Sequence, residues 1–335
     1  MERTLALQTW LGSLFSEQKW RIEPASADAS FRRYFRVSFS GSDETRIVMD
    51  APPQKEDCGP FIRVAELLRD AGLNAPGILA RDLSQGFLLL TDLGTTTYLA
   101  ALKQDDTRAD VLFADASAAL ITWQLASRPD VLPPYDRALL RRELDLFPDW
   151  YLSRHLNLAL TPEQTQMLER MFALILDANL AQPRVYVHRD YMPRNLMLSA
   201  PNPGILDFQD AVYGPISYDI ASLVRDAFIS WEEERALDWV VRYWDQARSA
   251  GLPVGSDFGD FYRDLEWMGL QRHLKVLGIF ARINYRDGKP DYLKDTPRFV
   301  RYVRAVCERY NALTPLAHLF DQIESRQAAQ GQDFP

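Results

Sequence analysis

The sequence predicts an α+β fold in two lobes, a small β-rich lobe followed by a larger, mainly helical lobe. Alternating apolar residues with turn signals lie before Asp92, whereas helical spacing of apolar residues dominates after Gly94. With 335 residues, of which 47% are hydrophobic, the chain can bury a substantial core. We therefore expect one lobe at residues 1–92 and a second at residues 93–335.

The elements follow from changes of hydrophobic period. In the first lobe we expect a helix over residues 5–14, strands over 34–39 and 46–49, a helix over 61–68, and strands over 77–80 and 87–91. Turn residues 40–43 separate the first two strands, and Gly72 ends the second helix. In the second lobe we expect helices over residues 111–125, 137–155, 163–180, 218–228, 231–250, 258–286 and 298–310.

Composition excludes several classes of protein. A net charge of −8 argues against nonspecific nucleic-acid binding, which requires an excess of basic residues. Cys58 and Cys307 are too few for a disulfide framework and lack the paired spacing of a zinc site, as is typical of a reducing compartment. The start of the chain has neither the pattern of a secretory signal nor that of a membrane anchor. We expect a cytoplasmic protein whose protein partners the sequence does not identify.

Residues 188–195 read His-Arg-Asp-Tyr-Met-Pro-Arg-Asn, and Asp207 follows after a short apolar strand that would deliver it to the same cleft. This spacing is typical of phosphoryl transfer, which depends on positioning and on neutralising phosphate charge. We expect Asp190 to accept or align the proton of the acceptor hydroxyl. Asn195 and Asp207 would hold Mg²⁺ against the phosphates of ATP. The alternative is a polar turn and an aspartate that merely caps a strand.

At these residues the chain resembles the aminoglycoside phosphotransferase family, a branch of the protein-kinase-like fold that phosphorylates small molecules. Besides residues 188–195, the predicted catalytic segment, the resemblance is carried by residues 30–36 (SFRRYFR), 88–94 (LLLTDLG), 207–210 (DFQD) and 218–221 (YDIA). It covers most of the chain. Within the family, residues 27–33 and 271–288 are most similar to bacterial sugar kinases of cell-wall recycling. Those kinases phosphorylate the anomeric hydroxyl of N-acetylmuramate and N-acetylglucosamine.

The resemblance implies a two-lobed protein-kinase-like fold, in which residues 1–92 bind nucleotide and residues 93–335 carry catalysis and acceptor binding. ATP would lie between the lobes, with its adenine against the backbone of the connecting segment at Leu90, Asp92 and Leu93. The alternative for that segment is an ordinary buried strand that ends in a glycine turn.

Ser30, Phe31, Arg32 and Arg33 occupy the place of a phosphate-covering loop. The segment lacks the glycines that let such a loop approach phosphates closely. Either arginine would suit a phosphate, but adjacent arginines are equally typical of a solvated strand edge.

Met49 stands where a kinase usually has a lysine that contacts the phosphates and pairs with a helix glutamate, here Glu66. A methionine cannot form an ion pair. Either another cation takes over, with Arg32, Arg33 and Lys55 as candidates, or Glu66 is simply a solvated helix residue. Because of its position, Met49 itself is also expected at the nucleotide site.

Acceptor residues are expected in the helical lobe. If residues 258–286 form one helix, then Arg272, Lys275, Arg282 and Arg286 fall within an arc of roughly 80°. This stripe would meet solvent, an acidic helix or an anionic ligand. If it meets the ligand, it favours an acceptor with a carboxylate, such as N-acetylmuramate, over a cationic aminoglycoside.

Further acceptor candidates are Arg194, Asp210 and Arg225, although a guanidinium such as that of Arg194 is as well suited to packing against a carboxylate. Asp219 begins a helical pattern, so we expect it to cap that helix or to anchor the catalytic segment.

Taken together, the residues and the resemblance predict an ATP- and Mg²⁺-dependent kinase for a small amino sugar. An aminoglycoside, homoserine or choline kinase would use the same three catalytic and metal-binding residues. A nucleotide-binding regulatory protein without catalysis is the alternative from another class, because the strand lysine and the loop glycines are absent.

Overall fold

The computed structural model describes residues 2–27 and 31–329, which divide into two compact units. The first unit comprises Met1–Asp106 and Arg194–Asp210, and the second comprises Thr107–Pro193 and Ala211–Pro335. A β-rich part and a larger helical part confirm the predicted α+β class. The lobe boundary after residue 92 stays a prediction. Ser30, a predicted nucleotide contact, lies outside the described residues.

An antiparallel five-stranded sheet forms the centre of the first unit, with the strand order β1-β2-β3-β5-β4. Its strands are β1 (Trp20–Ala27), β2 (Arg33–Phe39), β3 (Thr45–Asp50), β4 (Ile78–Asp82) and β5 (Phe87–Thr91). The sequence analysis missed β1 because Pro24 interrupts its pattern. Proline is tolerated on an edge strand, and the register shifts between Pro24 and Ser26.

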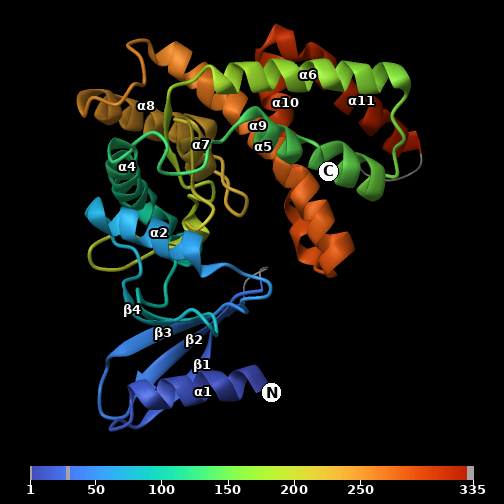
Figure 1. Ribbon diagram of the computed structural model, residues 1–335. Coiled ribbons are helices and arrows are strands. Elements are labelled where there is room, and N and C mark those ends of the chain that lie inside the picture. The colour runs from blue at the N-terminus through green and yellow to red at the C-terminus, as the bar shows by residue number, and fades with distance from the viewer. Residues whose placement is uncertain (1, 28–30, 330–335) are drawn as a thin grey trace. The chain divides into compact units, whose positions relative to one another are not determined.

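The two faces of this sheet are covered differently. The helix α1 (Glu2–Leu14) buries Leu7 and Leu11 against Val37, Val48, Phe87 and Leu89. In Figure 1 the sheet lies between α1 and α2 (Cys58–Asp70). Because successive strand residues point to opposite faces, Ile47 and Met49 lie on the face opposite α1.

A short hairpin completes the first unit and carries the predicted metal ligands. Its strands are β7 (Leu196–Met197) and β8 (Gly204–Ile205), and α3 (Tyr98–Gln104) packs beside β7. Asn74, before β4, fixes the hairpin through its backbone and its side chain. Its carbonyl accepts a 2.8 Å hydrogen bond from the Ile205 amide, and its side-chain amide donates to the Pro201 carbonyl at 2.6 Å.

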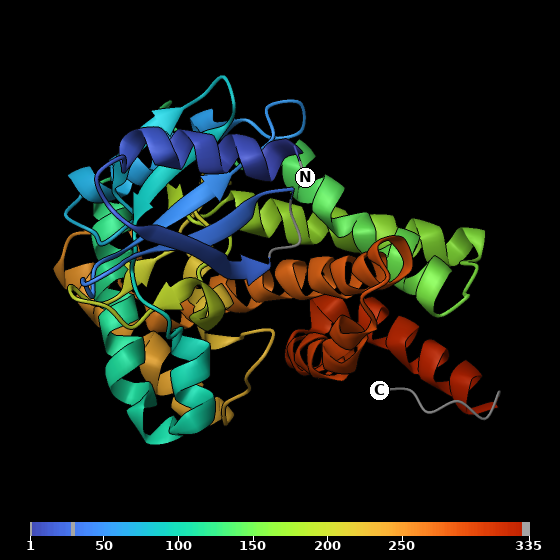
Figure 2. The same cartoon turned by 90° about the horizontal axis from the view of Figure 1, so that it is seen from below.

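The second unit is built around one long helix, α9 (Phe258–Asp287), which is orange in Figures 1 and 2. Side chains on all sides of α9 are buried, as is typical of a helix at the centre of a bundle. It packs against α5 (Arg137–Leu144), α6 (Pro162–Leu180), α7 (Tyr218–Val224), α8 (Glu233–Ser249) and α10 (Thr296–Arg309). The helix α4 (Ala109–Leu125) packs against α7 and α8, and α11 (Thr314–Ala329) packs against α6 and α10. The strands β6 (Arg184–Val187) and β9 (Val212–Pro215) pair antiparallel. Within residues 2–27 and 31–329, every helix is too short or too polar to span a bilayer.

The helix predicted over residues 137–155 is divided in the structure. The helix α5 ends at Leu144, and a π-helix follows over Phe147–His155, with a proline in its first turn that cannot supply a helical N–H. Gly278 of α9 lies against this junction, where a β-carbon would come within 2.3 Å of the Leu146 carbonyl. The division therefore depends on a close helix contact that local periodicity does not reveal.

Candidate active site

A cavity of about 420 Å³ lies within the first unit, on the sheet face opposite α1. The predicted site residues that line it are Leu90, Asp92, Leu93, Arg194, Asn195 and Asp207. Among the other lining residues, which sequence reasoning missed, are Tyr34, Arg36, Ile47 and Phe61. The alternation along β2 and β3 would have identified the first three as sharing one face.

The β7–β8 hairpin brings the two predicted metal ligands together. The Leu206 amide donates to the Asn195 carbonyl at 2.9 Å, and the Asn195 side-chain amide lies 3.3 Å from an Asp207 carboxylate oxygen. Asp207 has a positive φ of 61°, which is uncommon for a residue with a side chain and is often found at functional sites. Phe208 holds this turn in place by packing on Phe61 of α2, with 4.9 Å between ring centroids.

This donor set suits a magnesium ion. A carboxylate and an amide oxygen are hard ligands, and Mg²⁺ is usually held by one or two such groups together with substrate phosphates. No cluster of three or more His, Cys, Asp or Glu side chains that could hold a metal occurs among the described residues. Asp207 and Asn195 would supply two oxygen ligands, and the other ligands would have to come from phosphate or water.

Asp92 shapes the connecting segment through its side chain. Its carboxylate accepts hydrogen bonds from the Arg36 guanidinium at 2.5 and 3.1 Å, from the Thr45 hydroxyl at 2.8 Å and from the Gly94 amide at 2.9 Å. Burial raises the pKa of Asp92, but these hydrogen bonds outweigh it, so the pKa lies below its ordinary value. The carboxylate is thus an anionic anchor for the segment that lines the cavity.

The position of the missing lysine is apolar and enclosed. Met49 is fully buried on the cavity side of the sheet, and Glu66 is exposed on α2. Arg33 donates to the Asp50 carboxylate at 3.1 Å, and Arg3 of α1 donates to the same carboxylate at 2.8 Å. Because Arg3 belongs to the helix on the opposite face, the guanidinium of Arg33 is committed to the α1 side.

In the second unit, Asp219 anchors the catalytic segment, which is one of the two roles expected for it. Its carboxylate accepts the backbone amides of His188 at 2.6 Å and of Arg189 at 3.0 Å. Burial raises the pKa of Asp219 to about 7, although these two hydrogen bonds act to lower it. Arg189 has a φ of 75°, and the Asp190 amide lies 3.3 Å from the imidazole Nδ1 of His188. A buried carboxylate therefore holds the backbone of the two residues before the predicted base, one of which, Arg189, is in the left-handed conformation.

Behind this segment lies a buried cluster of charges centred on Glu143 of α5, which sequence reasoning missed. The Glu143 carboxylate accepts hydrogen bonds from Arg189 at 2.6 Å, from Lys275 at 2.8 Å and from Gln271 at 3.2 Å. It also accepts from the Tyr135 hydroxyl. Burial raises the pKa of Glu143, but the charges of Lys275 and Arg189 outweigh it and lower the pKa to about 2. Arg189, which precedes the predicted base, is thus linked directly to α5 and, through Glu143, to Lys275 of α9.

The predicted basic stripe on α9 does not form one uniform surface. Lys275 is buried, and besides Glu143 it contacts the Tyr218 hydroxyl at 3.1 Å, so it meets one buried carboxylate on a helix that is otherwise basic. Arg272 is 2% exposed and donates to the Arg225 carbonyl at 3.2 Å. Arg282 is half-buried, and its burial lowers its pKa.

The remaining acceptor candidates lie in both units. Arg194 and Asp210 are exposed in the first unit. In the second unit the Arg225 guanidinium is 3.8 Å from Glu233 and 3.4 Å from the Tyr262 hydroxyl.

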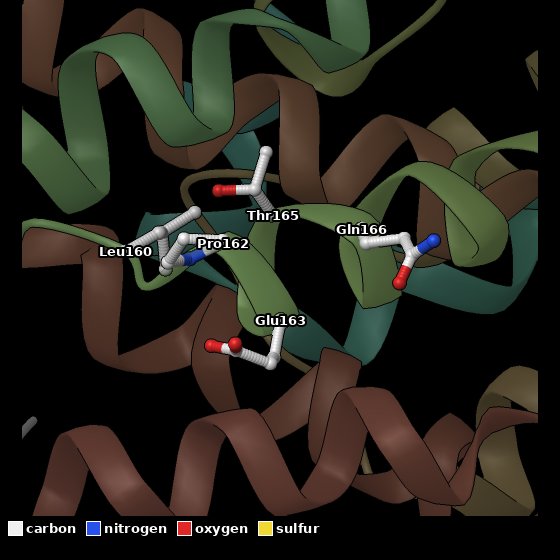
Figure 3. Close-up of a pocket in the computed structure, with 5 residues that line it drawn as sticks. All are labelled: Leu160, Pro162, Glu163, Thr165 and Gln166. Atoms are coloured by element: carbon white, nitrogen blue, oxygen red, sulfur yellow. The ribbon is translucent and has the colours of Figure 1, made fainter.

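A second hollow, of about 590 Å³, lies at the beginning of α6 (Figure 3). It is lined by Leu160, Pro162, Glu163, Thr165 and Gln166. Figure 3 shows the side chains of Glu163, Thr165 and Gln166 pointing in different directions. Without convergent polar groups, this hollow lacks the features of a catalytic site.

Known proteins resemble this chain in sequence over most of its length. The phosphotransferase enzyme family matches residues 21–254. The N-acetylmuramate/N-acetylglucosamine kinase of Pseudomonas aeruginosa is 53% identical over 323 residues, which cover 93% of this chain and 94% of the relative. The kinase of the same name from Neisseria meningitidis is 49% identical over 325 residues, 96% of each chain.

Among solved structures, the ADP-bound aminoglycoside phosphotransferase APH(2'')-Ib is similar with a TM-score of 0.58 at 14% identity, over 89% of this chain and 97% of that one. This likeness confirms the predicted kinase-like fold, and the family match confirms the resemblance first found in the catalytic segment. The chain therefore belongs to the phosphotransferase enzyme family, and it is a kinase.

Proposed function

We propose that the protein uses ATP and Mg²⁺ to phosphorylate the anomeric hydroxyl of N-acetylmuramate and N-acetylglucosamine, in the cytoplasmic recycling of peptidoglycan. The observation that carries this proposal is the 53% identity, over 93% of the chain, to a kinase named for these two sugars. The site chemistry supports it, because Asp190, Asn195 and Asp207 are the residue types that phosphoryl transfer requires.

In the proposed reaction the Asp190 carboxylate accepts the proton of the anomeric hydroxyl while that oxygen bonds to the γ-phosphorus and ADP departs. Asn195 and Asp207 would hold Mg²⁺, which would supply positive charge to the phosphate oxygens. ATP occupies the 420 Å³ cavity, with its base at the backbone of Leu90 to Leu93. The carboxylate of Asp92, through its hydrogen bonds to Arg36, Thr45 and Gly94, keeps that segment in place.

For the acceptor we propose contacts from Arg194, Asp210, Arg225 and Arg272. Lys275 has a smaller part in this proposal, because its ammonium group is already bonded to Glu143 and Tyr218. Arg282 would contribute only through its long-range charge. Within the second unit, the charges of Arg225 and Arg272, whose guanidinium donates to the Arg225 carbonyl, would attract the lactyl carboxylate of N-acetylmuramate.

A coupled ADP-release assay with matched acceptors tests the proposal. We expect turnover with N-acetylmuramate and N-acetylglucosamine, and none above the acceptor-free rate with an aminoglycoside, homoserine or choline. Phosphorus NMR of the product should show coupling to the anomeric proton. ADP release with only the cationic acceptors would refute the proposed substrate, and absence of turnover with every acceptor would favour a regulatory nucleotide-binding role.

A further inference from the structure

The enclosed methionine on β3 leaves the proposed triphosphate without its usual cation. Met49 shares a sheet face with Ile47, which lines the cavity, so a lysine at position 49 would project toward the cavity side. A thioether offers neither charge nor a hydrogen-bond donor. If the protein binds ATP, as proposed above, a cation from another element must meet the phosphates.

Two of the three candidate cations, Arg33 and Lys55, have other partners. Arg33 is bonded to Asp50 together with Arg3, on the α1 side of the sheet. The Lys55 ammonium lies 4.2 Å from the centroid of the Phe31 ring, which is a favourable cation–π distance. Each side chain would have to break its own contact before it could reach a phosphate.

Arg32 is held in a different way. Its guanidinium Nε lies 3.3 Å from one carboxylate oxygen of Glu56, and the side chains of the two residues are 13% and 16% exposed. The other carboxylate oxygen of Glu56 accepts the Phe31 amide at 3.2 Å. Glu56 therefore fixes both the backbone of the segment before β2 and the charged group that it carries.

The surroundings of Arg32 are anionic. Burial lowers the pKa of Arg32, but Tyr34, Glu56, Asp207 and Asp210 together outweigh it and raise the pKa. Arg32 directly precedes β2, whose Tyr34 and Arg36 line the cavity together with Asp207, the proposed metal ligand. A triphosphate placed among these groups would meet a fixed cation on one side and its metal ion on another, which is the arrangement that stabilises phosphate charge.

We infer that Arg32, positioned by Glu56, contacts the phosphates of ATP in place of the missing strand lysine. The ion pair of the kinase site would then be formed by Arg32, before β2, and Glu56, before α2, rather than by residues at positions 49 and 66. A guanidinium suits this task because its planar donors can contact two phosphate oxygens at once. The inference rests on the proposed nucleotide site and does not depend on which acceptor is used.

The test is nucleotide binding without any acceptor. Isothermal titration should give an affinity of Arg32→Met for Mg-ATP that is roughly tenfold to a hundredfold weaker than that of the unaltered protein. The affinity for adenosine should change by less than about twofold, because the base contacts remain. Arg32→Lys should recover part of the loss. Arg21→Met, which removes an exposed arginine from β1, is the matched control and should bind ATP normally.

The positioning role of Glu56 has a separate readout. Glu56→Gln should raise the KM for ATP several-fold while leaving the KM for the acceptor unchanged, and thermal melting of each variant should establish that it is folded. The inference is overturned if folded Arg32→Met binds Mg-ATP normally, or if it loses adenosine and ATP affinity equally. It is also overturned if Arg33→Met or Lys55→Met, rather than Arg32→Met, causes the selective loss. Failure of sugar phosphorylation alone would refute the proposed substrate and leave this result standing.

Discussion

Replacing Asp190 with asparagine is expected to lower turnover by roughly a hundredfold or more, which is the usual scale for loss of a general base. The amide keeps the size of the side chain but cannot accept the proton of the acceptor hydroxyl. Because Asp190 is not proposed to bind the metal ion or the nucleotide, the affinity for Mg-ATP should stay nearly normal. Single-turnover rates and titration with Mg-ATP measure the two effects separately.

Asp207→Asn is the matched comparison, since it makes the same chemical change at the proposed metal ligand. It should weaken Mg²⁺-dependent nucleotide binding as well as turnover, because a neutral oxygen holds a hard cation less strongly than a carboxylate does. If both variants kept the turnover of the unaltered protein, the assignment of the active site would be wrong. Impaired ATP binding in Asp190→Asn alone would reverse the two proposed roles.

The geometry around Asn195 and Asp207 was predictable because it depends on local spacing. A short apolar segment before Asp207 predicts a strand, and β8 occupies part of that segment at Gly204–Ile205. Since β8 pairs with the strand that follows Asn195, the two side chains lie side by side. Alternation likewise predicted most of β2, β3 and β5 within one or two residues of their observed bounds.

Partners that are distant in sequence were not predictable in this way. Arg36 meets Asp92 across 56 positions, and Glu143 meets Lys275 across 132. Helical periodicity groups cations on one side of α9, but it cannot tell a solvated arginine from a lysine buried beside a carboxylate. For the same reason the sequence left three cations as substitutes at Met49, and only their partners in the fold distinguish them.

Glu143→Ala should destabilise the protein by about 3–5 kcal/mol, which is the usual cost of leaving a buried charge without its partner. The side chains of Glu143, Arg189 and Lys275 are 7%, 18% and 10% exposed, so water cannot easily replace the lost carboxylate. Urea unfolding at pH 7 measures the effect. Glu169→Ala is the matched control, because it removes an exposed glutamate paired with Arg141 and should cost less than about 1 kcal/mol.

The pH dependence of this difference gives a second, independent check. The pKa of Glu143 is about 2 in the folded protein and 4.5 ordinarily, so the folded state favours the ionised carboxylate. Its contribution is therefore fully present above about pH 4.5 and is lost as the pH falls toward about 2. The stability gap between the unaltered protein and Glu143→Ala should narrow over that range. A stability difference that stays constant with pH would mean that packing, rather than charge, makes Glu143 important. If Glu143→Ala were as stable as the unaltered protein, the charge cluster would not be what holds the catalytic segment.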